Sequence, residues 1–251
     1  MTTRIAAVAN AAYQLFSSVT EQGASSVSKD GLARLLQLLS NVGTKDVDFD
    51  TRLVTDASGT HSPPVLYLHI VENAALSMGI FVLRPGARIP LHDHPDMFGL
   101  CRLIHGSLRC RAYSPASASA AAAAKAALAA RLLPRWQLPE LTAVTLSTDG
   151  VFTSASQPLL LTPSEGGYHE LQALGDGAAF IDILAPPYDH DLGQRVCRYY
   201  REVALPNSEE QNRQHLSADD EQQSKHVYLL EIPQPRDFVC GTVDYTGPKV
   251  T

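Results

Sequence analysis

One short segment holds the pattern that most constrains this chain, two histidines separated by a single residue. Gly86 is followed after five residues by His92-Asp93-His94, and Gly106 closes the segment. In a strand, side chains two positions apart leave the same face, so His92 and His94 point one way and Asp93 points the other. Two imidazoles that converge from one strand form half of a metal site.

The spacing of this segment resembles the first sequence motif of the cupin proteins, in which a glutamate usually follows the two histidines. That position is Gly99 in this chain, and glycine has no side chain to offer. The resemblance implies an all-β fold, the cupin double-stranded β-helix, which is a jelly-roll-like barrel. If a metal binds here, its protein ligands are expected to be neutral histidines alone.

A third histidine lies in the second half of the chain. The sequence Gly166-Gly-Tyr-His169 is similar to the second cupin motif, a turn that follows a strand, so His169 is the expected third ligand. Three imidazoles on one face of a metal leave the opposite positions open, as in the non-haem Fe(II) oxygenases with their carboxylate replaced. A neutral ligand set leaves Fe(II) its full charge and favours an anionic substrate group such as a thiolate.

The periodicity of the remaining chain predicts helices followed by strands. Apolar residues recur at helical spacing in residues 4–20 and 29–41, which indicates two amphipathic helices packed on a core. His105-Gly106 is expected to form a turn between two strands. In chain order, strands are expected over residues 65–72, 76–83, 89–94, 98–104, 107–113, 143–146, 158–162, 178–184, 196–203 and 226–232.

The domain organisation follows from these elements. Residues 1–45 are expected to form a helical segment packed on the barrel, and residues 60–251 a cupin domain, so the chain is effectively one domain. Residues 114–133 are nearly all alanine and serine and are expected to form a surface insertion between the two halves of the barrel. Residues 204–225 are expected to form a polar loop.

Composition restricts the partners and the compartment. The net charge of −6 argues against nucleic acid, because phosphate binding needs concentrated Lys and Arg. No run approaches the roughly 20 apolar residues of a membrane span, and no secretory signal is recognisable. The four cysteines (Cys101, Cys110, Cys197 and Cys240) are irregularly spaced, which argues against a disulfide framework or a zinc finger. We expect a monomer in the cytoplasm.

Several separated motifs together resemble the cysteamine (2-aminoethanethiol) dioxygenase and plant cysteine oxidase family. These are Ile89-Pro-Leu-His-Asp-His-Pro, Ile181-Asp-Ile-Leu-Ala-Pro-Pro-Tyr-Asp and Cys197-Arg-Tyr-Tyr-Arg. Pro64-Val-Leu-Tyr-Leu-His and the C-terminal Asp237-Phe-Val-Cys are closer to the animal cysteamine dioxygenases. The similarity spans most of the chain and is weakest in the alanine-rich and polar-loop segments.

The resemblance implies an Fe(II) enzyme that adds both atoms of O₂ to a thiol to give a sulfinic acid. The implied substrates are cysteamine and the N-terminal cysteine of proteins. Oxidation of the latter feeds the arginine branch of the N-degron pathway, so an oxygen-sensing role is implied. His92, His94 and His169 match the iron ligands of the family.

Four further residues match the family in its active-site region. Asp182 and Tyr188 match residues that line the site, and the Asp182 side chain is expected inside the barrel. There it could meet the ammonium group of a substrate, or it could pair with a buried arginine. Tyr188 could instead fix a loop by packing. Cys197 and Tyr199 match a pair reported to form a thioether crosslink in some members, although such a cysteine is more often a small core residue than a crosslink partner.

The residues that flank the histidines are expected to play lesser roles. Asp93 and Glu170 should face away from the metal, and Arg109 and Arg111 are expected on a solvated strand face. The family usually has glycine where this chain has Asp96. A carboxylate there, near the expected mouth of the site, could favour cationic amines or simply lie in solvent.

Two alternatives to an iron dioxygenase stay open. The first is a non-catalytic cupin that binds a ligand or partner, which predicts no O₂ uptake with any thiol. The second is a cupin enzyme that uses Ni, Mn or Zn, because imidazole suits several of these ions. The missing side chain at Gly99 argues against the second, since many such cupins keep the glutamate.

Overall fold

The computed structural model describes residues 2–17, 27–55, 62–119, 121–122, 141–189, 193, 195–203 and 226–250. The helical elements are α1 (Arg4–Phe16), α3 (Lys29–Ser40), the 3₁₀ helix η2 (Thr44–Val47) and α4 (Arg52–Thr55). The strands are β1 (Val65–Glu72), β2 (Ser77–Leu83), β3 (Arg88–Asp93), β4 (Phe98–Pro115), β5 (Leu141–Thr153), β6 (Leu159–Leu161), β7 (Tyr168–Ala185), β8 (Tyr199–Val203), β9 (His226–Ile232) and β10 (Cys240–Thr242). Most of the alanine-rich segment and all of the expected polar loop lie outside the described residues.

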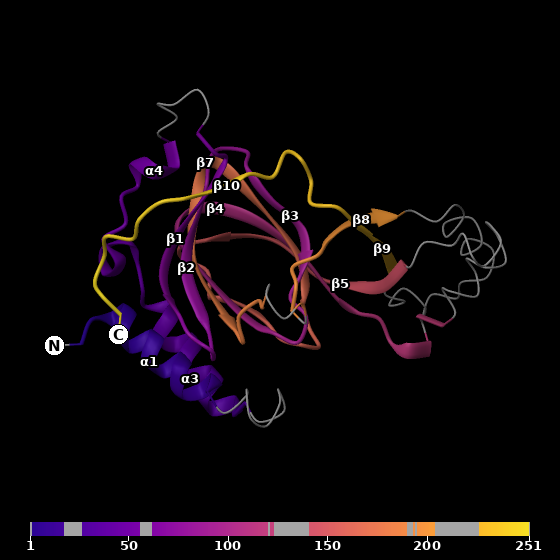
Figure 1. Cartoon of the computed structure of the whole chain (residues 1–251), viewed down its shortest axis with the longest axis horizontal. Coiled ribbons are helices and arrows are strands. Elements are labelled where there is room, and N and C mark those ends of the chain that lie inside the picture. Colours follow the sequence, from indigo (N-terminus) through magenta and orange to yellow (C-terminus); the bar gives the residue numbers. More distant parts are fainter. Residues whose placement is uncertain are drawn as a thin grey trace.

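The strands form a closed barrel. Antiparallel pairings run from β7 to β3, β8, β9, β5 and β4, and a further β4–β7 pairing closes the ring. On the other side of β7 the sheet continues through β2 to β1, with β10 parallel to β1. Figure 1 shows the barrel with α1 and α3 against one outer side and with β5, β8 and β9 extending away from it. The predicted all-β cupin barrel is confirmed.

The two N-terminal helices begin at side-chain caps. The Thr3 hydroxyl accepts a hydrogen bond from the backbone N–H of Ala6 at the start of α1, and Ser28 accepts one from Gly31 at the start of α3. Such caps satisfy backbone donors that have no partner within the helix. No helix among the described residues combines the length and the apolar character needed to cross a membrane.

Strand β7 separates two apolar clusters because its successive side chains alternate between its two faces. Ile181 and Ile183 belong to the cluster that includes the buried faces of α1 and α3. Phe180 belongs to a second cluster, which fills the barrel interior. Side chains that share the Phe180 face therefore point into the lumen, and Asp182 is one of them.

The C-terminal segment returns to the helical side of the barrel. Between β9 and β10 the chain runs across the top of the barrel in Figure 1, and after β10 it descends on the left to end beside α1. Val243, Tyr245 and Val250 pack against the cluster that contains the two helices. The two ends of the described chain thus help to cover the same outer sheet face.

The expected turn at His105-Gly106 is wrong, because β4 runs without interruption from Phe98 to Pro115. Gly106 pairs with Ala178 of β7, whereas the next residue pairs with Leu174, so three residues of β7 bulge at this point. Gly106 has φ of 72°, and a Cβ there would overlap the carbonyl oxygen of Gly177. The glycine thus permits a bulge inside two continuous strands rather than a turn between two short ones.

Other boundaries differ from the prediction in length. β7 begins at Tyr168 rather than at residue 178, and β8 begins at Tyr199 rather than at residue 196. The short elements η2, α4 and β10 were not expected. Each spans three or four residues, which is too few to show a periodic pattern.

We predict that Gly106→Ala destabilises the protein much more than Gly86→Ala. Both glycines have φ above 70°, but a Cβ at Gly86 has no atom within 4 Å. Gly86→Ala should therefore cost only the conformational penalty, about 1 kcal/mol, and Gly106→Ala about 3 kcal/mol or more because it adds a backbone overlap. Denaturant unfolding measures both values, and equal losses would contradict the role assigned to Gly106.

Candidate metal centre

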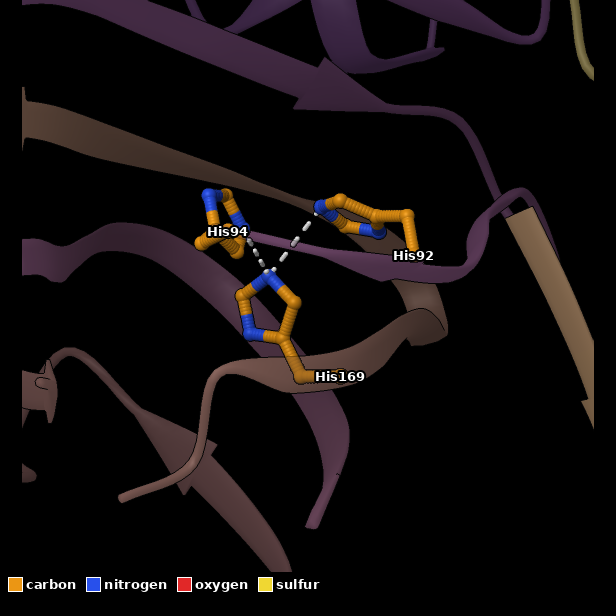
Figure 2. Close-up of side chains that lie close together, drawn as sticks. All are labelled: His92, His94 and His169. Carbon is orange, nitrogen blue, oxygen red and sulfur yellow. Dashed lines mark hydrogen bonds between the residues drawn. The ribbon is translucent and has the colours of Figure 1, made fainter. Parts of the chain in front are cut away.

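The three predicted ligands come together inside the barrel. His92 lies in β3, His94 follows that strand, and His169 is the second residue of β7. Register pairs His92 directly with His169 across the β3–β7 ladder. All three side chains are buried, and their ligand atoms lie within 4.8 Å of one another. Figure 2 shows the rings with nitrogen atoms turned toward a common point.

The spacing of the inner nitrogens fits a divalent metal. The Nε2 atoms of His94 and His169 are 2.9 Å apart, and those of His169 and His92 are 3.2 Å apart. Two imidazole nitrogens bound at right angles, each about 2.1 Å from a metal, would be about 3 Å apart. Small adjustments would therefore bring three lone pairs onto one ion.

The outer nitrogens of two rings fix their tautomers. His92 Nδ1 donates to the carbonyl oxygen of Pro90 at 2.8 Å. The Tyr188 hydroxyl donates to the carbonyl of Asp93 at 2.6 Å and lies 2.9 Å from His94 Nδ1. Because the hydroxyl hydrogen is used by that carbonyl, His94 Nδ1–H must be the donor to the tyrosine oxygen. Both rings therefore present an unprotonated Nε2 toward the centre, as metal-binding histidines do.

The third ring has no such support. His169 Nδ1 is buried and finds no hydrogen-bond partner among the described residues. Its Nε2 faces the corresponding nitrogens of both other rings. The buried, unpartnered Nδ1 carries a cost of its own. A metal at Nε2 would relieve a different one, the close approach of the three inner nitrogens.

Burial keeps all three imidazoles neutral. Loss of hydration lowers the pKa of His92 to about 4. The pKa values of His94 and His169 fall well below 6.5 through burial, with repulsion from neighbouring histidines adding to the effect. At neutral pH no proton has to be displaced before a metal binds. The site thus offers three neutral nitrogen donors, which suit Fe, Zn, Ni and Cu ions.

The position that carries a glutamate in many cupins is closed by packing. A Cβ on Gly99 would approach Leu161 Cδ1 to 2.9 Å, and Leu161 is buried. Register places these two residues opposite each other in the β4–β6 pair. The Leu161 side chain therefore fills the space beside Gly99 and would have to shift to admit a larger residue there.

A carboxylate lies in the lumen without a partner. Asp182 is flanked by Gly79 on β2 and Cys101 on β4. We find neither a hydrogen bond nor an ion pair to it in the part of the chain that is described, so the arginine partner considered from the sequence is not found there. Burial raises the pKa of Asp182 to about 7. An unpaired buried carboxylate is a suitable site for a cationic group of a ligand.

Tyr67 also lines this lumen, although it was not predicted from the sequence. Its ring covers the backbone of Gly79, so a Cβ at Gly79 would overlap the ring. The Tyr67 ring also packs at a tilt against Phe81, with ring centroids 4.9 Å apart. Burial raises the pKa of Tyr67, and the Asp182 charge adds to the shift. The signal in the sequence was a tyrosine in one strand and a glycine in the next, which becomes informative only when the register is known.

Tyr188, Cys197 and Tyr199 meet beside the histidines. The Cys197 thiol hydrogen-bonds with both tyrosine side chains, and Tyr199 pairs in register with His92. Burial raises the pKa of Cys197 to about 11, although the hydrogen bonds act in the opposite direction. The thiol is therefore protonated at neutral pH. Phe238 packs on Tyr199 with centroids 5.9 Å apart and was not expected there.

The outward-facing charged side chains form ion pairs on a solvated strand face. Glu170 accepts a hydrogen bond from Arg111 at 3.2 Å, and Arg111 also pairs with Glu202 at 2.8 Å. Arg109 makes two hydrogen bonds to Asp149. Glu170 faces away from the histidines as expected, and the two arginines lie on the solvated face of β4, where they pair with acids of neighbouring strands.

Asp96 lies on the surface just after the metal-binding segment. Its side chain is exposed, and its φ is 57°. In this left-handed region glycine has no steric penalty, whereas other residues are uncommon. The backbone conformation thus gives a physical reason for the glycine that the family usually has at this position.

A family model described as PCO_ADO matches residues 38–250. The chain belongs to the PCO_ADO family. A human relative, named 2-aminoethanethiol dioxygenase, is 37% identical over 226 residues, which cover 88% of this chain and 82% of the relative. An Arabidopsis thaliana relative, named plant cysteine oxidase 1, is 28% identical over 232 residues, 89% and 73% of the two chains. The predicted enzyme class, a thiol dioxygenase, is confirmed at the level of the PCO_ADO family.

Solved structures with lower similarity include double-stranded β-helix proteins. One from Klebsiella pneumoniae covers 59% of this PCO_ADO chain and 92% of its own, with a TM-score of 0.34 and 13% identity. KdgF from Halomonas sp. covers 52% and 86%, with a TM-score of 0.33 and 12% identity. Identities at this level concern the fold and not the chemistry.

We predict that Tyr188→Phe weakens metal binding by about 10- to 100-fold, because it removes the group that fixes the His94 ring. Chelator competition with the purified protein measures the affinity. Tyr168→Phe is the matched control, since Tyr168 also adjoins a ligand but stacks on Tyr200 instead. Equal metal affinity of the two variants would contradict the support assigned to Tyr188.

Proposed function

We propose that this protein is an Fe(II)-dependent thiol dioxygenase that oxidises cysteamine, the N-terminal cysteine of proteins, or both, to the sulfinic acid. The observation that carries the proposal is the convergence of three buried, neutral imidazoles in a chain of the PCO_ADO family. The human relative is named for 2-aminoethanethiol and the Arabidopsis relative for cysteine. These two thiols share one chemical unit, a sulfur and an amine joined by two carbons.

His92, His94 and His169 would hold the iron through their Nε2 atoms. Ferrous iron bound there would supply the one-electron chemistry that lets dioxygen react with a thiolate. The three residues contribute no negative charge, so they leave the charge of a divalent ion uncompensated. This favours a substrate that binds as an anion, and a thiolate is such a group.

Asp182 is proposed to bind the ammonium group of the substrate. Its carboxylate is buried in the lumen. Its charge contributes to the raised pKa of Tyr188, which contacts His94. An ammonium group would supply the partner that the described residues do not provide, and the pair would be strong because it is shielded from water. The carboxylate would thereby orient the sulfur toward the histidines, which is the positioning that the reaction needs.

Cys197 and Tyr199 are proposed to form a wall of the same site and to be capable of a thioether crosslink. Their direct contact and the register of Tyr199 with His92 support this role. Tyr188 closes the other side of the thiol. A protonated, hydrogen-bonded Cys197 would not compete with a substrate thiolate for the metal.

We propose that the protein works as a monomer in the cytoplasm and that its O₂ requirement makes it an oxygen sensor in the N-degron pathway. All three histidines come from one chain, so a second copy is not needed to complete the site. The four cysteines are free, which suits a reducing compartment. Family membership argues against a non-catalytic binding module.

The central test is anaerobic reconstitution with Fe(II), followed by O₂ uptake with cysteamine and with a Cys-initiated peptide. Mass spectrometry should find a product heavier by two oxygen atoms. His92→Ala and His169→Ala should lose iron and activity together, because each removes one of three ligands. Parallel loading with Zn, Ni and Mn separates the alternative metals. Full turnover in either variant, or activity with another metal alone, would refute the iron assignment.

We predict that Asp182→Asn lowers kcat/KM for cysteamine by at least about 30-fold, because it leaves the ammonium without a charged partner. Turnover of 2-mercaptoethanol, which lacks the amine, should change much less and serves as the control. An equal loss with both thiols would contradict ammonium binding by Asp182.

The same variant should alter the pH dependence of stability in the metal-free protein. The pKa of Asp182 is raised from 3.8 to about 7 in the folded state. The unfolded chain therefore releases this proton first, and ionisation costs folded-state stability as the pH rises from about 4 to 7. The unfolding free energy of Asp182→Asn should therefore rise relative to that of wild type across that interval, and the difference between the two should stay constant above it. A difference that does not change across the interval would show that burial does not raise the pKa of this carboxyl.

A further inference from the structure

Asp93 lies between two of the histidines but points to the opposite side of the strand. Its side chain is buried, and its main chain pairs in register with Tyr168 of β7. The hydrogen bonds of its carboxylate go to residues 198–200, and its main-chain carbonyl accepts one from Tyr188. These are the two segments that bring Tyr188, Cys197 and Tyr199 to the metal centre.

Four hydrogen bonds define the contact. Asp93 Oδ1 accepts from the backbone N–H of Arg198 at 2.8 Å, and Oδ2 accepts from the Tyr200 hydroxyl at 2.9 Å. The Asp93 N–H donates to the Arg198 carbonyl at 3.1 Å. The Asp93 carbonyl accepts from the Tyr188 hydroxyl at 2.6 Å. The Arg198 guanidinium, at 3.7 Å, adds an opposite charge.

These hydrogen bonds supplement the pairing of β3 with β8, which is very short. Strands β3 and β8 share a single register pair, His92 with Tyr199, and the other neighbour of β8 is β9. Without the carboxylate, the direct links between residues 197–199 and β3 would be this register pair and the main-chain bond from the Asp93 N–H to the Arg198 carbonyl. Because Arg198 is held at both its N–H and its C=O, the residues on either side of it, Cys197 and Tyr199, are held as well.

We propose that Asp93 is a positioning residue, which anchors residues 197–200 and Tyr188 against the histidines from the outer face of β3. This role rests on the proposed function in so far as it affects turnover. The anchoring itself concerns the protein alone and can be measured without iron. A charged acceptor suits it, because hydrogen bonds to an ionised group are stronger than those between neutral groups.

The test compares Asp93→Ala, Asp93→Asn and Tyr200→Phe with Glu170→Ala. Glu170 is the matched control, since it too adjoins a ligand and faces outward but contacts Arg111 instead. Asn keeps one oxygen for the Arg198 N–H and can donate to the Tyr200 hydroxyl, so it should rescue part of the Ala effect. Tyr200→Phe removes a single bond and should have a smaller effect than Asp93→Ala.

The first readout is alkylation of the cysteines by iodoacetamide in metal-free protein, resolved by peptide mapping. Cys197 should react about tenfold faster or more in Asp93→Ala, because the thiol is no longer held between the two tyrosines. Cys240, which is exposed, should keep its rate and serves as the internal reference. Glu170→Ala should behave as wild type. An unchanged Cys197 rate in folded Asp93→Ala and Tyr200→Phe would overturn the proposal.

The second readout is turnover of cysteamine by the iron-loaded variants. With iron content unchanged, kcat should fall by about 10- to 100-fold in Asp93→Ala while KM changes little. The reason is that the substrate contacts are retained, whereas the position of residues 197–199 relative to the histidines is not. If Asp93→Ala does not fold, Asp93→Asn and Tyr200→Phe decide by the same two readouts. If Cys197 is alkylated faster in Asp93→Ala but the iron-loaded wild type takes up no O₂ with cysteamine, the anchoring is supported and the proposed function is refuted.

Discussion

The antiparallel register of β3 and β7 is the constraint on which the rest of the site depends. It places His92 opposite His169, and the strand alternation then brings His94 to the same side. The distances of 2.9 and 3.2 Å between inner nitrogens follow from this pairing. A slip of one residue would turn one histidine to the other face, and the pairing of His92 with His169 is kept although the β3–β7 register shifts between Ile89 and His92.

Burial and neutrality of the three histidines follow from the same arrangement. Three imidazoles so close together could not all be protonated inside a barrel, because desolvation and mutual repulsion both oppose the charge. Packing also decides the number of ligands, since Leu161 fills the space beside Gly99. The chain thus specifies a three-nitrogen site both by the groups that it presents and by the space that it closes.

The sequence predicted the barrel and the three histidines because both depend on local patterns, namely strand alternation and fixed spacing. It failed where the outcome depends on register between distant strands. His105-Gly106 was interpreted as a turn, although Gly106 permits a bulge in β7 that includes Gly177. Tyr67 went unnoticed because only the pairing of β1 with β2 brings it over Gly79. Asp93 was expected to face away, which is correct, but its partners on β8 could not be inferred from spacing.

Two buried carboxylates on opposite sides of the barrel wall illustrate how burial separates structural from ligand-binding roles. Asp93 accepts hydrogen bonds from a backbone N–H and a tyrosine hydroxyl and lies near a guanidinium, so the fold offsets part of the cost of its burial, although burial still raises the pKa of Asp93. Asp182 has no such partner among the described residues, and its pKa rises to about 7. A fold retains an unsatisfied acid at a cost in stability, and that cost is recovered when a cation binds. This difference supports the two proposed roles, in which the satisfied acid anchors the walls of the site and the unsatisfied one binds a cationic group.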